Sequence, residues 1–290
     1  MAIKFKIGCH VSAAGGVFNA PKNALDLGCE TFQIFSRPPM GGKAPELTTE
    51  IIAQFHEQML KHKFNEFAVH CPYFVNFGSK EPRIYHGSIS VVGEELKRAN
   101  SLGAKYVMTH LGSAKDLGQE KAFNQTKKGL AEVLKKYQGQ TEFLLEIAAG
   151  SGEVIGDTFE ELAELMEPLV KFKTFGGICF DTQHAFSSGY DLRSSETVAE
   201  TFKKFDKIIG FKYLRMSHIN DSKVDLGGKK DRHDHIGQGK IGKQGFGAFL
   251  DYLSRHLKSA EVFPLIFETE HDKVKQDISI LKSLRDNPSK

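Results

Sequence analysis

Residues 142–149 read EFLLEIAA, a short run of large apolar side chains interrupted by one acidic residue, Glu146. Short apolar runs of this kind are typical of strands buried in a parallel sheet. Seven other stretches have the same character, and segments with apolar residues three or four positions apart separate them, as in 159–170 and 246–257. The eight predicted strands are KFKIGCHV (4–11), TFQIFS (31–36), EFAVHCPY (66–73), KYVMTHLG (105–112), EFLLEIAA (142–149), FGGICFDT (175–182), YLRMSHIN (213–220) and FPLIFETE (263–270).

Alternation of eight strands with helices predicts an α/β protein with a (β/α)8 TIM barrel, an architecture of about 250 residues plus insertions. A doubly wound open sheet is the competing architecture. It normally carries a glycine-rich phosphate turn after its first strand, and the segment HVSAAGG (10–16) does not match that pattern. No linker or shift in composition divides the chain. The sequence therefore predicts a single TIM-barrel domain over residues 1–290, with its functional site at the carboxyl-terminal mouth of the strands.

Composition narrows the class of protein. The chain has 290 residues, 40% of them hydrophobic and 26% charged, as is usual for soluble globular proteins. Its net charge of +3 is too small to argue for or against a polyanionic partner. The four cysteines are scattered, which favours a reducing compartment, and no apolar segment approaches the length of a membrane span. We therefore expect a cytoplasmic protein without a membrane partner.

Histidine and carboxylate residues follow the predicted strands at the end where a barrel has its mouth. Five are histidines and four are carboxylates, and two of the nine lie in the loop after the seventh strand. They are His70, His110, Glu146, Asp181, His184, His218, Asp231, His233 and Glu268. Because the carboxyl ends of barrel strands meet at one rim, we expect these side chains to lie close together.

A single histidine that closes an apolar strand is more often a hydrogen-bonded structural residue. A buried, unpaired Glu146 would cost several kcal/mol, so it needs a cationic partner. Six successive predicted strands each end in a histidine or a carboxylate. This repetition predicts a zinc or manganese cluster instead. Nine ligands suit three ions, since one zinc uses three or four. Three divalent cations would exceed the charge of four carboxylates, which suits an anionic substrate such as a phosphodiester.

The motifs resemble endonuclease IV, the family of metal-dependent apurinic/apyrimidinic (AP) endonucleases built on a TIM barrel. The resemblance covers essentially the whole chain. The motifs that carry it are HVSAAGG (10–16), HCPYFVNFG (70–78), THLGS (109–113), LEIAAGSG (145–152), FDTQHAFSSGYD (180–191), MSHINDSK (216–223), KDRHDHIGQGKIG (230–242) and PLIFETE (264–270). THLGS differs from the commoner HPG turn of the family but keeps His110.

The resemblance implies a division of the ligands among three zinc ions, with manganese or iron as possible replacements in part. One zinc would be held by His70 and His110, and Glu146 would bridge it to a second. The ligands of the second zinc would also include Asp181, His218 and Glu268. The ligands of the third would be His184, Asp231 and His233. Glu146, as the bridge, and Glu268, beside the nucleophile, would be the catalytic residues.

The implied reaction is a step of DNA repair. The phosphodiester 5′ to an abasic site in duplex DNA would be hydrolysed, leaving a 3′-hydroxyl and a 5′-deoxyribose phosphate. The same site would remove 3′-blocking groups. Because an open mouth must admit duplex DNA, we expect a monomer.

Residues for contacts with DNA are also implied. Tyr73 and Phe74 would wedge into the gap left by the missing base. In FSRPPMGGK (35–43), where many members carry an arginine at the position of Met40, Arg37 is the candidate for a wedge or a phosphate contact. The basic residues Lys230 and Arg232 would neutralise phosphates. His10, Asn76 and His235 would orient ligands, and Cys71 is expected to be a packing residue.

Two other functions fit part of the pattern. A metal-dependent sugar isomerase or epimerase on a related barrel would need only Glu146, Asp181, His218 and Glu268. A catalytically inactive protein that binds abasic DNA would be expected to have lost ligands, and the sequence retains all nine. The complete set therefore favours the nuclease.

Overall fold

The computed structural model describes residues 4–257 and 262–287. At its centre eight strands form a closed barrel in the order β1-β10-β7-β6-β5-β4-β3-β2, and every pairing between them is parallel. The strands are β1 (Lys4–His10), β2 (Thr31–Phe35), β3 (Ala68–His70), β4 (Tyr106–Thr109), β5 (Glu142–Glu146), β6 (Phe175–Cys179), β7 (Leu214–His218) and β10 (Val262–Phe267). The predicted TIM barrel is confirmed: seven of the predicted strands each contain one of these eight, and the predicted strand 263–270 overlaps β10, which begins one residue earlier, at Val262.

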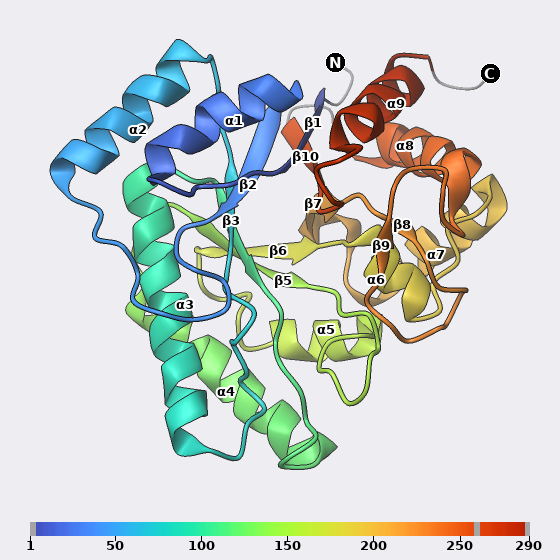
Figure 1. Ribbon diagram of the computed structural model, residues 1–290. Helices are drawn as coiled ribbons and strands as arrows, with labels where there is room; N and C mark the ends of the chain where they lie inside the picture. Colours follow the sequence, from blue (N-terminus) through green and yellow to red (C-terminus); the bar gives the residue numbers. More distant parts are fainter. Residues whose placement is uncertain (1–3, 258–261, 288–290) are drawn as a thin grey trace.

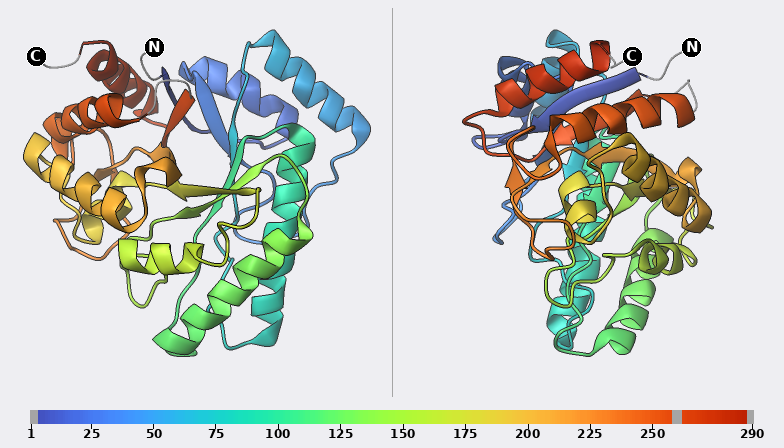
Figure 2. Two further views of the ribbon diagram at one scale, coloured as in Figure 1. Left: turned by 180° about the vertical axis from the view of Figure 1, so that it is seen from behind. Right: turned by 90° about the vertical axis from the view of Figure 1, so that its right-hand side faces the viewer.

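Helices surround the strands on the outside of the barrel, except the short helix α6 (Thr182–Ser187), which lies at the mouth beside the loop after β7 (Figures 1 and 2). The helices are α1 (Ala20–Leu27), α2 (Thr49–Lys61), α3 (Pro82–Leu102), α4 (Gln119–Lys136), α5 (Phe159–Met166), α6 (Thr182–Ser187), α7 (Ser195–Ile208), α8 (Gly242–His256) and α9 (Val274–Asp286), with short 3-10 helices η1 (Val17–Asn19) and η2 (Phe211–Tyr213). In Figures 1 and 2 the last helix, α9, lies beside β1, where Arg285 donates a hydrogen bond to the carbonyl of Phe5 over 3.1 Å. Within the described residues, no helix has both the length and the hydropathy to cross a membrane.

The interior of the barrel is closed by a layer of apolar side chains from six strands. Successive side chains of a strand point to opposite faces, so residues two apart share one face. Each member of this layer stands two positions before one of the predicted metal ligands. The layer consists of Ala68, Met108, Leu144, Cys179, Met216 and Ile266, and all six are at most 2% exposed; Tyr106, two positions before Met108, packs in the same cluster. Because of this two-residue period, six ligands point into the barrel directly above the apolar layer, which is called the apolar floor below.

A short antiparallel hairpin, which the sequence analysis did not predict, lies in the loop between β7 and α8. It pairs β8 (Asp221–Ser222) with β9 (His233–Asp234). The buried carboxylate of Asp221 accepts hydrogen bonds from the backbone N–H groups of five residues of its own loop, the partners being Ser222, Gly237, Gly239, Ile241 and Gly242. The hairpin and this carboxylate fold the long loop back over the mouth, which brings Asp231 and His233 to the site.

Candidate metal centre

The nine predicted ligands lie together at the carboxyl-terminal mouth of the barrel. Three groups of them place their ligand atoms within 4.8 Å of one another, and the groups overlap. The first group is His70, His110 and Glu146; the second is Glu146, Asp181, His218 and Glu268; the third is Asp181, His184 and His233. Glu146 belongs to two groups, as does Asp181, so the site is one continuous cluster.

In the first group, Glu146 lies between two histidines. The Nδ1–H of His70 donates to the carbonyl oxygen of Cys71 over 2.6 Å, which leaves the lone pair of Nε2 facing Oε2 of Glu146 at 3.0 Å. Nδ1 of His110 lies 3.8 Å from the same oxygen. A histidine that donates one N–H to a backbone carbonyl presents the other nitrogen in the form that binds a metal.

In the second group, Nδ1 of His218 faces three carboxylates. It lies 2.7 Å from Oε1 of Glu146, 3.3 Å from Oε2 of Glu268 and 3.8 Å from Oδ2 of Asp181. Asp181 is the N-cap of α6, because its Oδ1 accepts the backbone N–H of His184 over 2.8 Å. Its Oδ2 accepts a hydrogen bond from the side-chain amide of Asn220 over 2.7 Å.

At the open side of the mouth, Asp231 faces the two histidines of the third group. Its Oδ2 lies 3.4 Å from Nε2 of His184, and its Oδ1 lies 3.3 Å from Nε2 of His233. Nδ1 of His184 donates to the carbonyl of Ile147 over 3.0 Å, so its Nε2 faces the cluster. Among the described residues, Nε2 of His184 and Nε2 of His233 are buried and make no well-directed hydrogen bond.

The charges of this cluster favour the binding of cations. Burial lowers the pKa of His184, but Asp181 and Asp231 more than offset burial and raise it to about 10. Burial likewise opposes charge on Glu146, yet His110 and His218 hold the pKa of this carboxyl well below its usual range. Imidazole lone pairs that face ionised carboxylates repel them unless a proton or a metal ion lies between. With two histidine nitrogens left without hydrogen-bond partners, the donor set fits bound divalent cations.

Two buried amides that the sequence analysis did not single out hold ligands in place. Asn220 donates to Asp181 and accepts the backbone N–H of Glu268 over 2.8 Å. Gln33 contacts both Glu268 and His218. Asn220 lies two residues after His218, within the motif MSHINDSK (216–223), whereas nothing near Gln33 in the sequence marks it as part of the site.

Three residues predicted to orient ligands make other contacts. Nδ1 of His10 lies 3.0 Å from the amide nitrogen of Gln33 and contacts no ligand directly by hydrogen bond in the described residues. The side-chain oxygen of Asn76 accepts the backbone N–H groups of Gly78 and Ser113. Nδ1 of His235 pairs with Asp277 of α9 at 2.6 Å. Asn76 and His235 therefore fix loops of the mouth.

Tyr73 and Phe74, predicted to contact DNA, stand at the rim with 56% and 40% of their surface exposed. They line a hollow of about 510 Å³ that His110, His184 and Asp231 also line. Tyr73 and Asp231 also line a second hollow, of about 360 Å³, on the side of His233 and Glu268. Lys230 and Arg232 are exposed in the loop that carries Asp231. The rim therefore combines exposed aromatic and basic side chains around the cluster.

Arg37, predicted to contact DNA, is buried beneath its loop and paired with carboxylates of α3. Arg37 is only 7% exposed, and its guanidinium pairs with Glu95 at 2.6 Å and with Glu94 at 2.7 Å, both on α3. Moving a buried guanidinium away from its ion-pair partners is strongly unfavourable in free energy. Met40, beyond the two prolines, is 83% exposed and reaches solvent from this loop.

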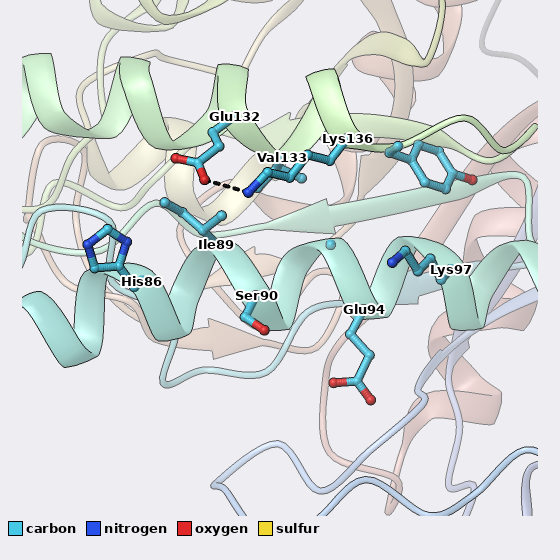
Figure 3. A pocket seen from close by; sticks show the side chains of 10 residues that line it. His86, Ile89, Ser90, Glu94, Lys97, Glu132, Val133 and Lys136 are labelled. Carbon is cyan, nitrogen blue, oxygen red and sulfur yellow. Dashed lines mark hydrogen bonds and ion pairs between the residues drawn. The ribbon is translucent and has the colours of Figure 1, made fainter.

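A separate hollow of about 520 Å³ lies outside the barrel between α3 and α4 (Figure 3). His86 and Ile89 of α3 face Glu132 and Val133 of α4 across it. Lys136 pairs with Glu132 at 2.7 Å beside it, and none of the nine predicted ligands lines it. This hollow is therefore unrelated to the cluster at the mouth.

The barrel and its histidine–carboxylate mouth define a metal-binding α/β barrel, and comparison with known proteins narrows the class. The family model described as xylose isomerase-like TIM barrel matches residues 21–284. A probable endonuclease 4 from Nitrosopumilus maritimus is 36% identical over 283 residues, with 97% of this chain and 99% of the relative covered. The chain therefore belongs to the endonuclease 4 family of xylose isomerase-like TIM barrels.

Solved structures agree with this placement. The crystal structure of endonuclease IV from Thermus thermophilus superimposes with a TM-score of 0.82 at 28% identity, and covers 97% of this chain and 99% of its own. A D-tagatose 3-epimerase-like protein has a TM-score of 0.74 at 21% identity, with 97% of both chains covered. The second likeness shows the fold alone.

Proposed function

We propose that this chain is a DNA-repair AP endonuclease that hydrolyses the phosphodiester 5′ to an abasic site in duplex DNA, leaving a 3′-hydroxyl and a 5′-deoxyribose phosphate. The observation that carries the proposal is the convergence of all nine ligands at one open mouth. Relatives matched over almost the whole chain bear the name probable endonuclease 4. The same site, acting on a 3′ end, would also remove 3′-phosphates and other 3′-blocking groups.

The chain's own residues prepare the site for three zinc ions. His70, His110 and Glu146 would hold the first, Glu146, Asp181, His218 and Glu268 the second, and His184, Asp231 and His233 the third. Bound zinc would supply positive charge for the phosphodiester and lower the pKa of the attacking water. Glu146 fixes the spacing of the first two sites, since its two oxygens face His70 and His218. Glu268 lines the hollow over the cluster and would orient the water there.

The rival function, a sugar isomerase or epimerase, accounts for the second group only. It gives no reason for Nε2 of His184 and Nε2 of His233 to be buried without hydrogen-bond partners. Nor does it explain exposed aromatic and basic residues around the mouth. A substrate with several phosphates, such as duplex DNA, uses both the extra metal ligands and the basic rim. The monomer is proposed because the mouth must remain open to such a substrate.

A gel assay with two duplexes tests the proposal. Purified protein loaded with zinc is expected to cut a duplex that contains one abasic analogue, on its 5′ side, and to leave an intact duplex whole. The product should be extended directly by a DNA polymerase, since extension requires a 3′-hydroxyl. Absence of incision by the zinc-loaded protein would refute the assignment, and turnover of ketose sugars would then establish the rival function.

Phe74→Ala and Tyr73→Ala are each expected to weaken binding to the abasic duplex by about 1–3 kcal/mol, which is roughly 5- to 150-fold in Kd, because stacking on exposed rings is lost. Phe74 gives the cleaner result, since the Tyr73 ring also packs edge-on against Phe35 at 5.1 Å. Affinity would be measured by fluorescence anisotropy with abasic and intact duplexes.

The matched control for these variants is Leu60→Ala. Leu60 is 79% exposed on α2, on the outside of the barrel. Metal content should be unchanged in all three proteins. If Phe74→Ala and Tyr73→Ala bind the abasic duplex as tightly as Leu60→Ala does, the rim aromatics do not contact the lesion.

A further inference from the structure

Strand β2 is the one barrel strand besides β1 that supplies none of the nine ligands, yet it places a polar side chain inside the barrel. Gln33 lies at the middle of β2, paired with His10 of β1 and with Ala68 of the apolar floor. It is fully buried. A buried amide is costly unless its hydrogen-bonding groups find partners, so the contacts of Gln33 are informative.

Three hydrogen bonds satisfy this amide. Its nitrogen donates to Oε1 of Glu268 over 2.7 Å and lies 3.0 Å from Nδ1 of His10. Its oxygen lies 2.8 Å from Nε2 of His218. One side chain thus reaches two residues of the second ligand group, which are 235 and 185 positions away along the chain.

These contacts fix the direction of the amide. A carboxylate that ligates a cation is ionised and offers only acceptors, and Oε1 of Glu268 lies 2.7 Å from the side-chain nitrogen of Gln33. The group facing Glu268 must therefore be the NH2 of Gln33, and the oxygen must face His218. That oxygen only accepts, so Nε2 of His218 must carry the proton. The lone pair of Nδ1 then points at Glu146, Glu268 and Asp181.

We propose that Gln33 is the positioning residue of the second cation site: its amide sets the tautomer of His218 and holds Glu268 by one oxygen, so that the other faces the cation. This inference rests on the proposed metal cluster and deepens it. Oε2 of Glu268 remains free toward His218 because Oε1 is occupied by Gln33. Hydrogen-bonding partners behind metal ligands typically change metal affinity by about 10–100-fold.

The test uses the full chain stripped of metal and titrated with cobalt(II) alone. Gln33→Met keeps the approximate volume of the side chain and removes the hydrogen bonds to Glu268 and His218. It is expected to bind the cation at His218 and Glu268 roughly 10–100-fold more weakly. Cobalt shifts the NMR signals of ligand N–H protons strongly. The signal of Nε2–H of His218 should be lost, while those of Nδ1–H of His70 and His184, which donate to backbone carbonyls, should remain.

The matched control is Thr31→Val. Thr31 is buried on the same strand, and its hydroxyl donates to the carbonyl of Glu66, away from the cluster. This variant should bind cobalt as the natural chain does. On the abasic duplex, Gln33→Met should lower kcat with KM little changed, because it alters the cluster and leaves the DNA-binding rim intact.

Gln33→Glu is the second variant, for the case that Gln33→Met does not fold. It has the same shape but presents an oxygen to Glu268, so weaker cobalt binding is again expected. The inference would be overturned if the folded variants bound cobalt as tightly as the natural chain and Gln33→Met kept the NMR signal of Nε2–H of His218. Because cobalt binding needs no DNA, a natural chain that binds cobalt but leaves abasic DNA uncut would refute only the proposed function.

Discussion

Glu146→Gln is expected to lower kcat/KM for incision of the abasic duplex by roughly 10³-fold or more. Its carboxylate is fully buried and is shared by His70 on one oxygen and His218 on the other. An amide has the same shape but no negative charge, and its NH2 would face one of these histidines. Two neighbouring cation sites would therefore lose their common ligand at once. Steady-state kinetics and elemental analysis for metal would measure the loss.

The control for this variant lies on the same strand. Glu142 is four positions earlier on β5, at the far end of the barrel, where it pairs with Arg215 at 3.1 Å and is partly exposed. Glu142→Gln should retain nearly full activity, since exposed ion pairs contribute little. If Glu146→Gln kept activity within about tenfold of Glu142→Gln, Glu146 would not be the bridge between two ions.

The part of the site that the sequence predicts best is the part built by strand periodicity. An apolar residue of the floor precedes each of six ligands by two positions, as Leu144 precedes Glu146 and Met216 precedes His218. This pattern is local, so it can be recognised without the fold. Parallel strands then bring the six ligands to one end because all of them run in the same direction.

The parts that sequence reasoning missed depend on partners far along the chain. Arg37 looks like an exposed basic residue of a loop, but Glu95, 58 positions later, buries its guanidinium. Gln33 looks like an ordinary polar residue of a half-buried strand until Glu268 and His218 are placed beside it. The hairpin that presents Asp231 and His233 is held by Asp221, whose backbone partners lie up to 21 positions away. The members of these pairs become neighbours only when the chain has folded into the closed barrel.

Removal of the metal should affect activity far more than it affects the fold. Dialysis against a strong chelator is expected to abolish incision, by about 10³-fold or more, and zinc should restore it. The stripped chain should remain folded, because protons can take the place of cations between histidines and carboxylates; the pKa of His184, raised to about 10 by Asp181 and Asp231 against the effect of burial, indicates such a proton.

The thermal stability of the same samples separates the two effects. A cation at about 1,000 times its Kd stabilises the folded state by about 4 kcal/mol per site, so the zinc-loaded chain should melt at a clearly higher temperature than the stripped one. In Glu146→Gln the gain on adding zinc should be smaller, because two sites share the missing carboxylate, whereas in Glu142→Gln it should equal that of the natural chain. Equal melting temperatures with and without zinc, in protein shown by elemental analysis to be free of metal beforehand, would mean that the nine residues do not form a metal centre.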